Sequence, residues 1–211
     1  MKLYKKLIVV TAIGLVVSAS AVASLAYKTD GSKLRNDITT AQTDITVVES
    51  SWDAKPDADR DGIKDHAEEM TQGLHMVKDP AVRNDSTVSM YCFLEITIPC
   101  KNVMTVENAP RRQKTELFSF TKGANWTELK RTNSTTETKI LYGYENAVAP
   151  GGTTGKLFTE VVYANVVEGE IPSGTVLNLN VQGYAIQQKT FSSMRDAYNS
   201  FDWNQSYMNG R

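Results

Sequence analysis

Apolar and polar side chains alternate along several short stretches of the chain, with the period of two that is typical of β-strands. The clearest alternation covers residues 88–98. One face carries Cys92, Leu94, Ile96 and Ile98, and the other carries Tyr91, Phe93, Glu95 and Thr97. Because successive side chains of a strand point to opposite faces of a sheet, this segment predicts a strand with a strongly apolar face.

The same texture recurs along much of the chain. Further strand-like segments are residues 37–49, 116–120, 125–130, 139–144, 156–167 and 175–187. A turn signal stands at Pro150-Gly151-Gly152, residues 168–174 form another turn region, and residues 131–138 are a polar separator. Several short strands separated by turn signals predict an all-β protein, an antiparallel β-sandwich.

Two segments depart from the strand pattern. Residues 50–79 are acidic and contain Pro56, Gly62 and Gly73, with a short helix expected at residues 65–72. Residues 192–203 place Met194, Ala197, Tyr198 and Phe201 at helical spacing, which predicts a short amphipathic helix near the C-terminus. We therefore expect an insertion between strands and a C-terminal helix.

The length and composition fit one globular domain. The chain has 211 residues, of which 41% are hydrophobic and 22% charged, and this length supports a sizeable core without disulfides. The formal net charge is -1, and no basic stripe with interleaved aromatic residues is present. This balance argues against nucleic acid as the main partner.

The N-terminus has the features of a secretory signal peptide. Lys2, Lys5 and Lys6 precede an uncharged run over residues 7–26, which is most apolar at first and then rich in small residues. Cleavage after Ala26, with Ala23 as a second option, leaves residues 27–211 as the mature domain. The alternative is an uncleaved membrane anchor, because about 20 uncharged residues can span a bilayer. We expect export, with membrane contact only before cleavage.

The sequence at residues 57–69, DADRDGIKDHAEE, fits a calcium-loop motif. The expected ligands are Asp57, Asp59, Asp61, the Ile63 carbonyl, Asp65 and Glu68. Gly62 permits the sharp turn, and an all-oxygen ligand set suits Ca²⁺. Pro56 abuts the loop without a convincing entering helix, so an isolated structural loop is expected rather than an EF-hand sensor. The alternative is a solvated acidic loop whose aspartates make turns.

Residues that carry catalysis in other proteins are sparse. His66 and His75 lie outside any H-E-x-x-H motif, and neither a G-x-S-x-G nor a Gly-rich phosphate loop is present. Cys92 and Cys100 are eight residues apart on one expected strand, about 26 Å, which is too far for a bridge unless the strand ends early at Pro99 and turns back. Cys92 is expected to be a buried apolar residue, and Cys100 a free or an intermolecular thiol. We expect no enzyme activity.

Several segments, taken in order and spacing, resemble one family. They are Ala26-Tyr27-Lys28-Thr29-Asp30, Asp44-Ile45-Thr46-Val47, Lys78-Asp79-Pro80-Ala81-Val82-Arg83-Asn84, Tyr91-Cys92-Phe93-Leu94-Glu95-Ile96-Thr97-Ile98-Pro99, Lys114-Thr115-Glu116-Leu117-Phe118, Leu157-Phe158, Ala164-Asn165-Val166-Val167-Glu168-Gly169 and Tyr184-Ala185-Ile186-Gln187. Together they resemble the TasA/camelysin (CalY) family of Gram-positive bacteria, whose signal peptides are of the SipW-dependent type. Lys28 replaces a Phe common in the family, and Ala41-Gln42 stands where a Gly-Asn pair is usual.

The resemblance implies a jelly-roll-like β-sandwich that a dedicated signal peptidase processes and that assembles into fibres of the extracellular or biofilm matrix. In such fibres the N-terminal strand of one subunit completes the sheet of the next, and the corresponding donor segment here is residues 27–49. Expected partners are further copies of the chain and other matrix proteins. The camelysin branch implies an alternative, a secreted metalloendopeptidase, for which this sequence offers no zinc motif; zinc-dependent cleavage of casein would discriminate. A monomeric calcium-dependent surface adhesin is a third interpretation.

Overall fold

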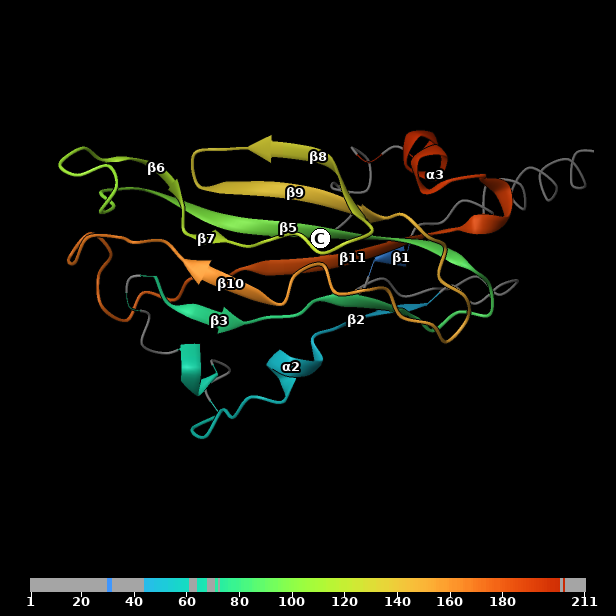
Figure 1. Ribbon diagram of the computed structural model, residues 1–211, viewed down its shortest axis with the longest axis horizontal. Coiled ribbons are helices and arrows are strands. Elements are labelled where there is room, and N and C mark those ends of the chain that lie inside the picture. Colours follow the sequence, from blue (N-terminus) through green and yellow to red (C-terminus); the bar gives the residue numbers. More distant parts are fainter. Residues whose placement is uncertain are drawn as a thin grey trace, which may run out of the picture.

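The strand β5 (Met90–Val103) is the centre of the fold and runs along the length of the molecule in Figure 1. The computed structural model describes residues 30–31, 44–60, 64–67, 71, 73–201 and 203. In the described ranges, β5 belongs to a six-stranded sheet with the order β1-β11-β5-β9-β8, and β6 pairs with the far end of β5. The other strands are β1 (Asp30–Gly31), β6 (Gln113–Glu116), β8 (Trp126–Asn133), β9 (Glu137–Tyr144) and β11 (Asn180–Gln187).

Two smaller sheets complete the described strands. One has the order β3 (His75–Val77), β10 (Glu160–Tyr163), β7 (Phe118–Ser119), and the other joins β2 (Ile45–Val48) to β4 (Ala81–Asn84). The helical segments are α2 (Ser50–Asp53), α3 (Met194–Ser200) and the 3-10 turns η1 (Asp65–Ala67) and η2 (Gln188–Thr190). All strand pairs are antiparallel. The prediction of an all-β protein with a short C-terminal helix is confirmed.

The two faces of β5 meet two different sets of side chains. Cys92, Leu94 and Ile96 lie in the main core, together with residues of the smaller sheets such as Met76 and Val161. On the opposite face, Tyr91 and Phe93 lie in a second cluster with Met194, Ala197 and Trp203. The predicted alternation is therefore correct, and both faces of the strand are covered, which is why its burial is almost continuous.

Two glycines let neighbouring layers approach the large sheet closely. A Cβ atom placed on Gly183 of β11 would lie 2.6 Å from Val47 Cγ2, so β2 rests directly against the backbone of β11. A Cβ atom on Gly143 of β9 would overlap the side chain of Met194, so α3 rests in the same way on β9. In both places the absence of a side chain is what allows the contact.

Two predicted strands are wrong in extent. Residues 116–120 do not form one strand. Glu116 ends β6, which pairs with β5, whereas residues 118–119 form β7, which pairs with β10 in another sheet. Leu117, between the two strands, is fully buried. Residues 156–167 contribute only the four residues of β10. Leu157 and Phe158 are apolar because they fill the main core from a connecting segment, and Leu157 bonds through its backbone to Pro80 and Gly123. Core-filling loop residues and strand residues look alike in sequence.

Other boundaries move by a few residues. β8 and β9 extend into the predicted polar separator at 131–138, so only a tight turn around Ser134 connects them. β11 begins at Asn180, five residues after the start of the predicted strand at 175–187. β5 continues through Pro99, which has no backbone N–H to donate. β11 pairs with β5 only as far as Thr97, so the proline lies beyond the β11–β5 ladder and interrupts none of its hydrogen bonds. Of the helix expected at 65–72, the structure describes the single turn η1.

We predict that Gly183→Ala lowers the free energy of unfolding by about 1–3 kcal/mol, because the new methyl group must displace Val47 or shift the β11 backbone. Gly155→Ala is the matched control, since the nearest atom to its Cβ is at 3.7 Å, an ordinary contact. Urea denaturation of both variants checks this prediction. Equal stability of the two variants would show that β2 does not rest on Gly183.

Candidate functional site

The acidic segment leaves the sheet after β2, on the side of the molecule opposite α3 in Figure 1. Its base is held by Asp79, whose side chain is almost fully buried. The carboxylate accepts backbone hydrogen bonds from Ser51 N at 3.0 Å and from Trp52 N at 3.2 Å, which are orphan donors of the first turn of α2. Lys156 Nζ lies 2.9 Å from Asp79 Oδ2. One carboxylate thus joins the start of the segment to its end.

A second ion pair closes the same base. Lys78 Nζ lies 2.7 Å from Glu49 Oε2 and 4.6 Å from the centroid of the Trp52 ring. Burial raises the pKa of Glu49, and Lys78 opposes this rise. Burial also opposes ionisation of Asp79, but hydrogen bonds from Lys156, Ser51 and Trp52 outweigh it and lower the pKa of that carboxyl. Asp79 is therefore charged at neutral pH and stabilises the base of the segment.

In the described part of the predicted calcium loop, hydrogen bonds of Asp65 join the two ends of the loop. Asp65 N donates a hydrogen bond to Pro56 O at 3.1 Å, and Asp65 Oδ1 accepts one from Ala58 N at 2.8 Å. These two bonds hold Asp65, the ninth loop position, against the residues on either side of Asp57, the first position. Asp59 is exposed, whereas Asp57 is half-buried. Its Oδ1 atom is shielded from solvent, and none of the described residues donates a hydrogen bond to it. A shielded, unbonded carboxylate oxygen at the first loop position is compatible with a cation ligand.

The other three predicted ligands, Asp61, Ile63 and Glu68, lie outside the described residues. In the ranges that the structure does describe, no three His, Cys, Asp or Glu side chains gather closely enough to hold a metal ion. Asp57, Asp59 and Asp65 are thus placed in one loop by the structure, but they do not form a cluster of three by themselves.

The outer edge of β11 is a second candidate site. β5 pairs with all eight residues of β11, whereas on the other side β1 pairs with two, Asp30 opposite Ala185 and Gly31 opposite Tyr184. In the described part of the chain, the remaining residues of that edge have no strand partner. An edge with unpaired backbone groups is a template for a further strand.

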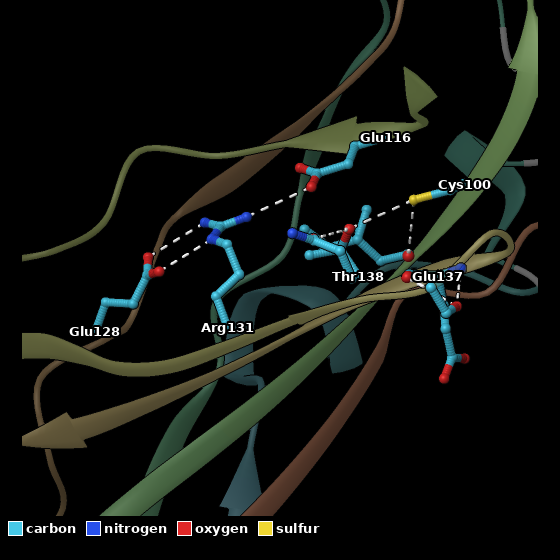
Figure 2. A network of polar contacts seen from close by, with 9 residues as sticks. Cys100, Glu116, Glu128, Arg131, Glu137 and Thr138 are labelled. Carbon is cyan, nitrogen blue, oxygen red and sulfur yellow. Dashed lines mark hydrogen bonds and ion pairs between the residues drawn. The ribbon is translucent and has the colours of Figure 1, made fainter. Parts of the chain in front are cut away.

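The opposite edge of the sheet, β8, has a different character. Its pairing with β9 is interrupted by a bulge between Glu128 and Lys130. Next to the bulge, Arg131 Nε lies 2.9 Å from Glu128 Oε1, and Arg131 Nη1 lies 3.4 Å from Glu116 Oε1 of β6, as Figure 2 shows. Bulges and charged side chains are features that discourage edge-to-edge pairing.

Cys100 belongs to a buried polar cluster beside this edge. Its Sγ atom lies 3.5 Å from Thr138 Oγ1, which donates a hydrogen bond to Asn133 Oδ1 at 3.0 Å (Figure 2). Cys100 is 2% exposed and unbridged within the chain. Cys92 is also unbridged, and burial raises its pKa to about 12, so it is an apolar core residue as expected.

Sequence patterns missed the residues that organise both sites. Asp79 bonds to residues 27 and 28 positions earlier, and Gly183 contacts a strand from the opposite end of the domain. Neither residue stands in a local motif. A lone aspartate before Pro80 and a single glycine inside a strand pattern are the available signals, and the glycine pattern does indicate a close backbone approach.

Comparison with known proteins adds no assignment: no family model, curated protein or solved structure matches the chain. The predicted signal peptide at residues 1–26 lies outside the described residues. Among the helices of the described ranges, none combines the length and the apolar character of a membrane span.

We predict that Asp79→Asn lowers the free energy of unfolding at pH 7 by about 1–3 kcal/mol, because the buried carboxylate that accepts from Ser51 N, Trp52 N and the half-exposed Lys156 loses its charge. The lowered pKa of Asp79 means that its stabilisation is complete above the ordinary value of about 4 and is lost as the pH falls through the lowered value. The difference between variant and wild type therefore shrinks at acid pH.

Urea denaturation at pH 7 and pH 3 measures this difference. Glu137→Gln, which breaks an exposed pair with Lys139, is the control and changes stability by about 0.5 kcal/mol or less. An Asp79→Asn deficit that is equally large at both pH values contradicts the assignment of the effect to the charge.

Proposed function

We propose that this protein is a secreted structural subunit of the bacterial cell surface or biofilm matrix, without catalytic activity, that assembles into fibres by donating an N-terminal strand. The observation that carries the proposal is the pairing of β1 with two of the eight residues of β11. An N-terminal segment that already uses this edge within its own chain identifies the edge as its binding site. A second copy then offers the same segment to the same edge.

The energetics favour such an exchange. A strand that leaves its own β11 and pairs with the β11 of a neighbour makes the same backbone hydrogen bonds, so the swap costs little. A longer pairing in the neighbour also satisfies edge groups of β11 for which the described residues provide no strand partner. Self-assembly is therefore favoured when the intramolecular pairing is short.

The two edges of the large sheet differ, and this difference supports fibre growth by strand donation at the β11 edge. β11 accepts a strand, whereas β8 carries the bulge, Lys130 and the Arg131 ion pairs. A sheet with one open and one protected edge adds strands in one direction and avoids uncontrolled stacking. Head-to-tail contacts of this kind produce filaments and not closed dimers.

The donated part is the portion of residues 27–49 that precedes β2. β2 pairs with β4 over four residues of its own chain, and Val47 rests on Gly183. These contacts make β2 part of the receiving body, while the residues before it supply the strand that is exchanged. Removal of a signal peptide at residue 26 frees this segment, so processing by a dedicated signal peptidase serves as the assembly switch.

We further propose a jelly-roll-like β-sandwich with a Ca²⁺ loop, held by Asp57, Asp59, Asp61, the Ile63 carbonyl, Asp65 and Glu68, in the inserted acidic segment at 50–79. The closed loop from Pro56 to Asp65 and the shielded Asp57 oxygen support a cation at this place. Bound Ca²⁺ would neutralise the crowded carboxylates and stiffen a segment whose base Asp79 already holds. Its role is structural.

The assembly prediction uses a deletion. Removal of residues 27–37 from the processed chain abolishes filaments, since the segment that contains β1 is lost while β2 and the cores remain. Negative-stain electron microscopy and size-exclusion chromatography measure the result, with circular dichroism to confirm that the β-structure persists. Filaments as abundant as those of the wild type reject strand donation.

The calcium prediction uses calorimetric titration of the processed chain. Glu68→Gln and Asp57→Asn each weaken Ca²⁺ binding by about tenfold or more, because each removes a charged ligand of the loop. Asp53→Asn, an exposed acidic change outside the motif, leaves the affinity unchanged. Wild-type protein that takes up no Ca²⁺ at millimolar concentration contradicts the site, whatever the outcome for filaments.

A further inference from the structure

The C-terminal end of the described chain covers the outer face of β11 and β5. We name α3 together with Phe201 and Trp203 the C-terminal cap. Trp203, 6% exposed, is its main contact residue: its ring centroid lies 5.2 Å from that of Phe93 on β5 and 5.6 Å from that of Tyr184 on β11, edge-on in both cases. One indole therefore touches the two strands that form the open side of the sheet.

The cap depends on this contact for its own structure. α3 has seven residues, too few for a stable isolated helix, so packing must hold it. Within the cap, Trp203 lies against Tyr198 and Phe201, and its Nε1 atom donates a hydrogen bond to Tyr198 O at 2.9 Å. Met194 fixes the other end of the helix on Gly143 of β9. Trp203 is thus the link between the cap and β11.

Tyr184 is the residue at which the cap meets the N-terminal strand. Its backbone is the partner of Gly31 in β1, and its side chain, 5% exposed, lies in the cap cluster with Trp203. The neighbouring Ala185, partner of Asp30, points into the main core. The residues of β11 that accept β1 are therefore those that the cap and the core hold from the two faces.

We propose that Trp203 is a positioning residue for strand acceptance: by packing on Tyr184 it keeps the edge of β11 in the extended form that pairs with the N-terminal segment. The proposal rests on the proposed function for pairing between copies, but it applies equally to the pairing within one chain. The cap then links the C-terminal end of the domain to the N-terminal strand. Loss of its packing on Tyr184 lets the edge of β11 leave the extended form with which β1 pairs. The effect acts through Tyr184, whose ring contacts Trp203 and whose backbone pairs with Gly31.

Hydrogen exchange on the monomeric processed chain, which contains every described residue, tests this inference. The measured quantity is the exchange rate of the amides of residues 180–187 by mass spectrometry. In β11 the odd-numbered residues face β1, because Gln188 N bonds to Ser89 O and the even-numbered residues therefore face β5. Asp30→Pro removes the β1 N–H that faces Ala185 and sets the rate that follows loss of strand pairing. Trp203→Ala is expected to raise the rate by about tenfold, a factor that corresponds to about 1.4 kcal/mol.

Three comparisons separate positioning from general stability. Tyr144→Ala removes a half-buried aromatic ring at the opposite side of the sheet, beside Trp126, and leaves the rate at 180–187 unchanged. Trp203→Phe keeps a ring against Tyr184 and restores most of the protection, and it replaces Trp203→Ala if that variant fails to fold. The double variant Asp30→Pro/Trp203→Ala exchanges no faster than Asp30→Pro alone, because both changes remove the same pairing.

The outcomes are distinct from those of the assembly test. Wild-type protection of 180–187 in Trp203→Ala, additive effects in the double variant, or no effect of Asp30→Pro overturns the inference, even if filaments form. Absence of filaments from wild-type protein rejects the proposed function, while the exchange result still decides the role of Trp203.

Discussion

Backbone hydrogen bonding along β11 is the constraint on which the other features of this protein depend. β5 satisfies one side of the strand over its whole length, and the N-terminal β1 satisfies the other side at two positions. Unpaired N–H and C=O groups at a sheet edge must be hydrated, covered or paired with another chain. At the other edge of the same sheet, β8 carries a bulge and charged side chains, which are features that discourage pairing with another strand.

Packing on both faces makes β11 a defined surface and not a loose edge. On the inner face, β2 approaches the backbone at Gly183 through Val47. On the outer face, Tyr184 lies under the aromatic cluster of Trp203. A strand held from both sides keeps its register, because a shift by one residue would exchange every inward side chain for an outward one. The proposed acceptor is therefore built by parts from both ends of the chain.

The acidic segment follows a different physical rule, the compensation of buried or crowded negative charge. At its base Asp79 is buried, and the cation of Lys156 and two backbone N–H groups balance its charge. At its tip the carboxylates of the loop are closer to solvent, and the closed turn between Pro56 and Asp65 holds two of the predicted ligand positions near each other. At the base the compensating cation is Lys156 of the protein itself. At the tip we propose that a divalent cation has this role.

The sequence by itself determined the local features. Alternation over 88–98 identified the central strand and assigned Cys92 to the apolar face, and the spacing of Met194, Ala197 and Phe201 identified the C-terminal helix. These features depend on neighbours a few residues apart, which a periodic pattern can reveal. The calcium-loop motif over residues 57–68 is equally local, and three of its six expected ligands lie outside the described residues. Only the tertiary structure decided that residues 116–120 split between two sheets, that Leu157 fills the core from a loop, and that Tyr184 joins Gly31 to Trp203. Such contacts link positions far apart in the chain, and no spacing within one segment carries that information.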